Sequence, residues 1–193
     1  MKEDRNIEYL VGKKAKLDVF LEPFSFKIVS FLDDLSKALD NNSNNKNFPD
    51  LKALSFFCRK NNILSLKDKH QTKNSTRFGL GLLFHVTPSN IPTNFAYSLI
   101  FGLISGNSNI VKVPSKKFDE IGIICKSINY VLNEKKHIKV KNMITVIRYA
   151  SNNDLLTKKF SAICDARLIW GGDKTITDIK KFDTKPKNID IPF

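Results

Sequence analysis

Long apolar runs and a secretory signal are both missing from this sequence of 193 residues, and each absence excludes a class of protein. No apolar run approaches the ~20 residues that a helix needs to span a bilayer, so a membrane-spanning protein is not expected. The N-terminus, MKEDRNIEYL, carries acids within its first four residues and has no long apolar stretch, unlike a secretory signal. We therefore expect a cytoplasmic protein.

Cysteine is scarce and is not paired. The three cysteines, Cys58, Cys125 and Cys164, lie far apart, and their odd number rules out an even framework of bridges. No two of them have the close spacing of a zinc site. Nothing beside them in the sequence supplies the base or the positive field that a nucleophilic thiol needs. We expect three structural thiols and no metal site.

Arginine is also scarce, although the chain is strongly basic. The net charge is +13, but arginine occurs only at positions 5, 59, 77, 148 and 167, and the other basic residues are lysine. A basic balance can indicate nucleic acid, an anionic membrane surface or a phosphate-bearing ligand. Specific base readout and bidentate phosphate contacts favour arginine. A lysine surface in contact with solvent is the simpler interpretation, and a nucleic-acid partner is not expected.

Residues 1–76 are predicted to form an N-terminal helical region. An apolar stripe at helical spacing predicts a first helix: Ile28, Phe31, Leu32, Leu35 and Leu39. Residues 40–47 form a polar loop, and Asp50 after Pro49 can cap a second helix. The polar, lysine-rich segment 60–76 is expected to be a connector.

Residues 77–193 alternate strands with helices and predict an α/β fold. The expected strands are 79–86, 109–113, 143–149 and 167–170, all aliphatic and poor in charge, as strands buried on both faces are. The expected helices are 92–104, 116–133 and 154–163, with a short helical stretch at 174–182. This order is typical of a parallel, Rossmann-like sheet with right-handed crossovers.

The turn after the first of these strands is the most particular stretch of the chain. It reads Thr87-Pro88-Ser89-Asn90-Ile91-Pro92, and such a turn is where a parallel βαβ unit holds its ligand. The amide of Asn90 can donate a fixed hydrogen bond into the cleft and stabilise a developing oxyanion. It can also simply cap the following helix, and composition alone favours the cap.

Two further features lie at the ends of strands, and a histidine lies inside one. Gly171-Gly172 follows a strand and opens a helix, so its backbone can approach a phosphate, although glycine pairs are also ordinary turns. Lys112 and Lys116 flank Pro114-Ser115, where they either contact a ribose or phosphate or face solvent. His85, inside the first strand, is interpreted as a hydrogen-bonded core histidine rather than a base.

The segments FGLGLLFHVTPSNIPTNFAYSLIFGLISGNSNIVKVPSK (78–116) and ARLIWGGDKTI (166–176) closely resemble the acyl-CoA reductase family. This family includes the fatty acid reductase of bacterial bioluminescence and lies within the aldehyde dehydrogenase superfamily. The resemblance covers about residues 22 to 193. It implies a nucleotide-binding domain of the aldehyde dehydrogenase type and NADPH-dependent reduction of a fatty acyl thioester to an aldehyde. In that reaction a cysteine takes the acyl group and hydride from the nicotinamide releases the aldehyde.

The resemblance also implies roles for single residues. Asn90 matches the asparagine that helps to hold the thiohemiacetal oxyanion. Thr87, Pro88 and Ser89 would lie beside the nicotinamide half of the cofactor. Gly171 matches the first glycine of the helix that binds the pyrophosphate, with Gly172 beside it, but the superfamily's second glycine is Ile176 here.

The ribose segment departs from the superfamily pattern at two positions, and the second departure favours NADP over NAD. Pro114 and Ser115 match the superfamily's Lys-Pro-Ser-Glu segment at the adenosine ribose. The lysine of that segment is Val113 here, with Lys112 one place earlier, and its glutamate is Lys116. A cation at this position tolerates a 2′-phosphate better than a carboxylate does.

The nucleophile is the larger departure. In the superfamily the glutamate base and the cysteine follow the glycine-containing strand end, whereas Cys164 precedes Gly171. We therefore expect the NADPH-binding portion of an acyl-CoA reductase, truncated before its catalytic half and inactive alone, because covalent catalysis needs the thiolate. A second chain or a C-terminal half would then be its partner. The alternative is a non-catalytic basic module that binds nucleic acid or another polyanion.

Overall fold

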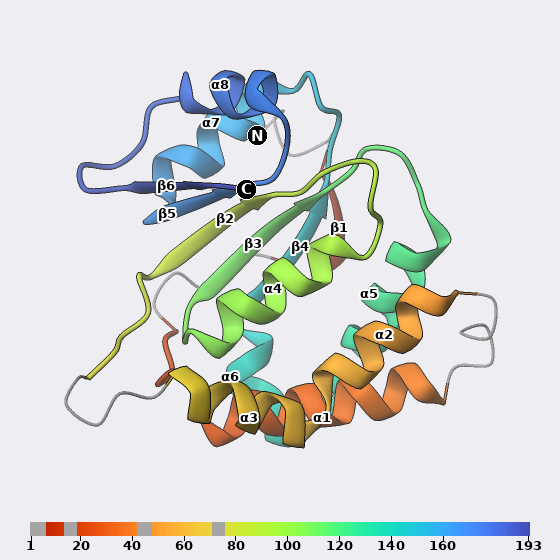
Figure 1. Ribbon diagram of the computed structural model, residues 1–193. Coiled ribbons are helices and arrows are strands. Elements are labelled where there is room, and N and C mark those ends of the chain that lie inside the picture. The colour runs from red at the N-terminus through yellow and green to blue at the C-terminus, as the bar shows by residue number, and fades with distance from the viewer. Residues whose placement is uncertain (1–6, 14–18, 42–47, 71–75) are drawn as a thin grey trace.

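A computed structural model describes residues 7–13, 19–41, 48–70 and 76–193, and these form one sheet with helices on both faces (Figure 1). The strands are β1 (Glu8–Val11), β2 (Leu82–Val86), β3 (Ser108–Val113), β4 (Ile144–Arg148), β5 (Ala166–Ile169) and β6 (Ile189–Pro192). The helices are α1 (Phe26–Asp40), α2 (Pro49–Cys58), α3 (Lys60–His70), α4 (Asn94–Ile104), α5 (Asp119–Leu132), α6 (Ile138–Lys141), α7 (Asp154–Ile163) and α8 (Asp173–Lys180), with a 3-10 turn at Lys135–His137.

The strand order is β1-β4-β3-β2-β5-β6. Strands β2 to β6 are parallel, and β1 joins the edge antiparallel to β4. From β2 the chain moves to β3 and β4, then returns to the other side of β2 to form β5 and β6. Connections therefore leave the neighbours β2 and β5 in opposite directions. In open α/β sheets such a switch point is where ligands bind, outside the carboxyl ends of the strands. The predicted α/β fold and parallel sheet are confirmed.

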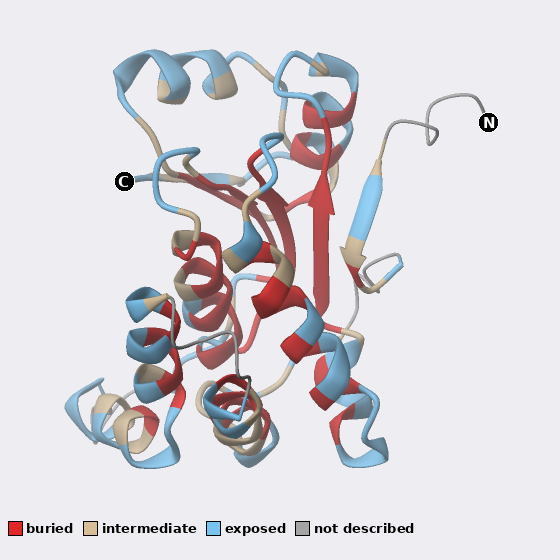
Figure 2. Cartoon of the chain, turned by 90° about the vertical axis from the view of Figure 1, so that its right-hand side faces the viewer, coloured by how far each residue is buried: buried red, intermediate tan, exposed pale blue. Residues whose placement is uncertain are grey.

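Helices cover the sheet in two unequal layers. Helices α4 and α5 pack against one face around Val111 and Val146, with α1 packed against these helices and α2 against α1, and α7 packs against the other face around Phe84 and Ile147. Figure 2 shows the central strands buried between these layers while β1 is largely exposed at the edge. All residues of β2, β3, β4 and β5 are buried. Burial on both faces explains why these strands are rich in aliphatic residues, although polar side chains such as His85, Lys112 and Arg167 occur among them.

The N-terminal region differs from the prediction in two places. Residues 60–70 form α3 rather than a connector, and residues 8–11 form β1 rather than part of a helical region. Helix α3 buries only Ile63, so its sequence has almost no apolar periodicity to detect. The apolar stripe of α1 is buried as predicted. The polar loop at 40–47 falls mostly outside the described residues. The division into units 1–76 and 77–193 stays a prediction; α1 and α2 share a core with α4 and α5.

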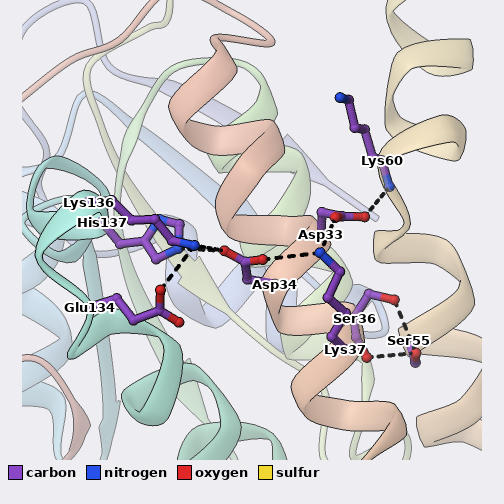
Figure 3. Close-up of polar contacts among 9 residues, drawn as sticks. All are labelled: Asp33, Asp34, Ser36, Lys37, Ser55, Lys60, Glu134, Lys136 and His137. Carbon is purple, nitrogen blue, oxygen red and sulfur yellow. Dashed lines mark hydrogen bonds and ion pairs between the residues drawn. The ribbon is translucent and has the colours of Figure 1, made fainter.

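An ionic cluster fastens α1 to the turn before α6 (Figure 3). Lys136 Nζ lies 2.6 Å from Asp34 and 3.0 Å from Glu134, and His137 Nε2 lies 3.0 Å from Asp34. Burial raises the pKa of Asp34, but the hydrogen bonds from Lys136, His137 and Lys37 together outweigh it and lower that pKa. The three potential metal ligands Asp34, Glu134 and His137 lie within 4.8 Å of one another. Because the Lys136 ammonium already supplies the positive charge, we interpret the cluster as a cross-link rather than a metal site.

Candidate functional site

A pocket of about 740 Å³ opens at the carboxyl ends of β2, β3 and β5. The residues that line it come from the loop after β2, the ends of β3 and β5, and helices α7 and α8. The structure brings nine of the predicted site residues together there: Thr87, Pro88, Ser89, Asn90, Lys112, Pro114, Ser115, Gly171 and Gly172. Two segments far apart in the sequence thus border a single pocket at the switch point of the sheet.

The loop after β2 is tied to β3. The Thr87 hydroxyl donates to the Lys112 carbonyl oxygen at 2.8 Å, and the Thr87 backbone N–H donates to the same oxygen at 3.3 Å. Asn90 is exposed beside this anchor and lines the pocket. The N-cap residue of α4 is Thr93, so the alternative that Asn90 caps this helix is wrong. Asn90 is therefore a lining residue of the pocket rather than the N-cap of α4.

The two candidate lysines have different surroundings. Lys112 is buried at the end of β3, lines the pocket, and places Nζ 5.0 Å from the centre of the Tyr149 ring. Burial lowers the pKa of Lys112. Lys116 is exposed, lies outside the lining, and places Nζ 5.1 Å from the centre of the Phe118 ring. The role predicted for Lys116 stays a prediction, and the cation of the pocket itself is Lys112.

The glycine turn leaves the N-terminus of α8 open. Gly172 is the N-cap residue of α8, and a Cβ added there would meet no atom within 4 Å. Free N–H groups at a helix N-terminus favour a phosphate or another anion. Asp173 in the first turn of α8 opposes such an anion, so the turn alone does not define a site. The turn does line the same pocket as the Asn90 loop.

His85 is a satisfied core residue, as the sequence indicates. It is fully buried, with Nδ1 2.7 Å from Ser98 Oγ and Nε2 3.0 Å from Asn109 Oδ1. Burial lowers the pKa of His85 to about 4, although the hydrogen bond with Asn109 opposes this shift. The imidazole is therefore neutral at pH 7 and does not line the pocket.

This lowered pKa predicts a loss of stability in acid. Below the ordinary histidine pKa of about 6.5, His85 is protonated in the unfolded chain but stays neutral in the folded chain down to about pH 4. The free energy of unfolding therefore falls as the pH drops from 6.5 towards 4. The full loss is of order 3 kcal/mol, from 1.36 kcal/mol for each pKa unit. Urea unfolding at pH 7, 5.5 and 4 measures it. His85→Gln, which cannot titrate, is expected to lose less over this range; an equal loss would contradict the assignment.

The three cysteines are buried thiols. Burial raises the pKa of Cys58 and of Cys125 to about 12 and that of Cys164 to about 11. None of the three lines the pocket. At neutral pH they are protonated and inaccessible, which confirms the expectation that they are structural.

Sequence reasoning missed several residues of the pocket wall. Trp170 and Phe193 line it with their rings stacked, centroids 4.2 Å apart, and Thr157 and Thr175 enter from α7 and α8. The Trp-Gly-Gly-Asp motif pointed to the glycines but not to the indole beside them. Phe193 lies in the tail, which carried no strand signal because it contains two prolines. Within the described residues, every helix is too short or too polar to cross a membrane.

Solved structures of similar fold are aldehyde dehydrogenases. A NAD-dependent benzaldehyde dehydrogenase from Corynebacterium glutamicum has a TM-score of 0.62 and 12% identity, covering 88% of this chain and 42% of that one. The glyceraldehyde-3-phosphate dehydrogenase GapN from Methanocaldococcus jannaschii, solved with NADP, has a TM-score of 0.56 and 15% identity, covering 86% and 41%. The chain thus spans less than half the length of these enzymes.

A protein-family model assigns the chain to a family, which the structural comparisons alone do not. The model of acyl-CoA reductase (LuxC) matches residues 52–193, which is more than half of the chain. No curated protein matches this chain. The resemblance expected from the turn at 87–92 and the strand end at 170–173 is therefore confirmed. The chain belongs to the acyl-CoA reductase (LuxC) family and has the α/β fold of aldehyde dehydrogenases.

Proposed function

We propose that this chain binds NADPH in the pocket at the switch point, as the cofactor-binding part of an acyl-CoA reductase. The observation that carries the proposal is that the Asn90 loop and the Gly171–Gly172 turn line one pocket. The family match and the dehydrogenase fold support an enzyme of this type. One enzyme of similar fold, GapN, was solved with NADP.

The charge of the pocket supports NADP rather than NAD. Among the described residues that line it, none is Asp or Glu, and Lys112 is the only charged one. A site that recognises the 2′-hydroxyl of NAD uses a carboxylate, whereas the 2′-phosphate of NADP needs a cation. We assign the ribose end of the cofactor to Lys112 and Ser115. The N–H groups of the Gly172 turn would hold the pyrophosphate.

Asn90 would act at the reacting end. Its amide N–H would donate to the oxygen that becomes negative when a thiolate adds to the carbonyl of a fatty acyl thioester. Bound NADPH supplies hydride for the release of an aldehyde. The buried, protonated cysteines of this chain do not suit the role of nucleophile. We propose that the nucleophile comes from a C-terminal half or a second chain, and that this chain alone does not reduce the thioester. The cytoplasm remains the compartment that the sequence favours.

A calorimetric titration with NADPH and with NADH tests the site. Saturable NADPH binding is expected, and Lys112→Met is expected to weaken it about tenfold, because it removes a charge-assisted phosphate contact of about 1.4 kcal/mol. NADH binding should change less. Lys52→Met, an exposed lysine of α2, is the matched control and is expected to bind as the wild type does. Lys116→Met decides whether the second lysine contributes.

The polyanion alternative is tested in the same experiment. Replacing NADPH by a DNA duplex at two salt concentrations measures counterion release. Strongly salt-dependent DNA binding without any response to NADPH would reject the cofactor site in favour of a basic binding module. Equal affinity of Lys112→Met and wild type for NADPH would reject the assignment of the ribose end.

A further inference from the structure

Trp170, the only tryptophan of the chain, lines the pocket and makes three contacts there. Its backbone N–H donates to the Val86 carbonyl oxygen at 2.9 Å. Its ring stacks on Phe193 with the two planes 11° apart. Its indole Nε1–H donates to Ser98 Oγ at 3.0 Å. This last contact fixes the direction in which the indole N–H points.

Ser98 connects the indole to a buried hydrogen-bonded chain beneath the pocket. Ser98 Oγ lies 2.7 Å from His85 Nδ1, and His85 Nε2 lies 3.0 Å from Asn109 Oδ1. Asn109 Nδ2 in turn donates to the Asn107 carbonyl oxygen at 2.7 Å. All four residues are buried, and none lines the pocket. The chain links β5, α4, β2 and β3.

The donors and acceptors of this chain are assigned by chemistry. Because Asn109 Nδ2 is used as a donor, the carbonyl oxygen Oδ1 faces His85 and can only accept. His85 therefore carries its proton on Nε2, and its bare Nδ1 accepts from the Ser98 hydroxyl. The remaining lone pair of Ser98 Oγ is then aimed at the indole, which is purely a donor. One proton arrangement satisfies every member, and such networks fix a single geometry.

We propose that Ser98 and His85 are positioning residues for the dinucleotide pocket, which they shape by fixing the indole of Trp170 beside the Gly171–Gly172 turn. The inference rests on the proposed function, because NADPH is the ligand assigned to this pocket. Neither residue touches the ligand. Without the Ser98 hydroxyl the indole N–H loses its partner, and the ring is held less firmly, by its stacking on Phe193 alone. Binding must then order the side chain again, which weakens affinity about tenfold at most.

The test compares Ser98→Ala with Ser127→Ala, a buried serine of α5 that lies outside the pocket. The first readout is the calorimetric dissociation constant for NADPH. The second is the exchange of the single indole N–H with solvent, followed by NMR in the absence of ligand. Ser98→Ala is expected to bind NADPH about fivefold to tenfold more weakly and to lose the protection of the indole N–H. Ser127→Ala is expected to change neither.

Trp170→Phe completes the test, because it keeps an aromatic ring on Phe193 and removes the N–H donor, although the ring is smaller. If the contact is what matters, the double variant binds NADPH no more weakly than the weaker single variant. Additive losses, or wild-type affinity of either single variant, would overturn the inference. Should Ser98→Ala not fold, Trp170→Phe alone decides, and unchanged affinity rejects the inference. Failure of the wild type to bind NADPH would instead reject the proposed function, and the inference with it.

Discussion

Replacing Gly102 by alanine is expected to destabilise the protein by about 2–3 kcal/mol, whereas the same change at Gly122 is expected to stabilise it by up to ~1 kcal/mol. Both glycines lie inside helices, in α4 and α5. A Cβ at Gly102 would overlap Asn109 Oδ1 and approach His85 Cε1 to 3.2 Å. At Gly122 it would meet no atom within 4 Å. The added methyl group therefore breaks a buried network in one helix and only improves helix propensity in the other.

Urea unfolding of the two variants beside the wild type measures both effects. The change at Gly102 should also weaken NADPH binding, because it displaces Asn109 and thereby the histidine that supports Ser98. Equal stability of the two alanine variants would contradict the close approach of α4 to β3. That approach is the reason for a glycine in the middle of an otherwise apolar helix.

Removing the carboxylate of Asp190 is expected to cost about 3–5 kcal/mol, the usual penalty for leaving a buried charge without its partner. Arg167 of β5 is 2% exposed. It donates from Nε to Asp190 Oδ1 at 2.6 Å and from Nη2 to Oδ2 at 2.8 Å. Its Nη1 donates to the carbonyl oxygens of Ile179 and Phe182. The guanidinium thus joins β5, β6 and the end of α8. Asp190→Ala leaves this buried charge without its carboxylate partner.

The double variant Arg167→Met, Asp190→Leu is the control. Because it removes the buried charge together with its partner, it is expected to be more stable than Asp190→Ala alone. Urea unfolding of the three proteins gives the comparison. A loss below about 1 kcal/mol for Asp190→Ala would show that solvent reaches the guanidinium and that the pair behaves like a surface ion pair.

The central strands and the pocket motifs were predictable from local sequence, and the edges were not. Strands β2 to β5 are buried on both faces, so each is rich in aliphatic residues and stands out from the polar segments around it. Strands β1 and β6 are four residues each and largely exposed, and β6 contains Asp190 and a proline. Their pairing depends on partners elsewhere in the chain. Short edge strands of this kind carry little signal of their own.

The candidate site likewise contains features that the sequence predicted and features that it did not. The Asn90 loop and the glycine pair were recognisable because special residues stand directly after buried strands. Which lysine faces the pocket was not, since it depends on side-chain direction, and the structure selects Lys112 over Lys116. The support of Trp170 by Ser98 was also hidden, because the two residues are 72 positions apart.

The pairing of β1 with β4 has a consequence for biosynthesis. Glu8 lies opposite Arg148, and their side chains form an ion pair across 140 positions of sequence. At ribosomal rates of about 5–20 residues per second, β1 waits on the order of ten seconds before β4 has been made. Throughout that interval its backbone N–H and C=O groups have no strand to bond. This border of the sheet cannot close until translation has passed Arg148, so nascent chains that stall earlier carry a β1 without its partner strand.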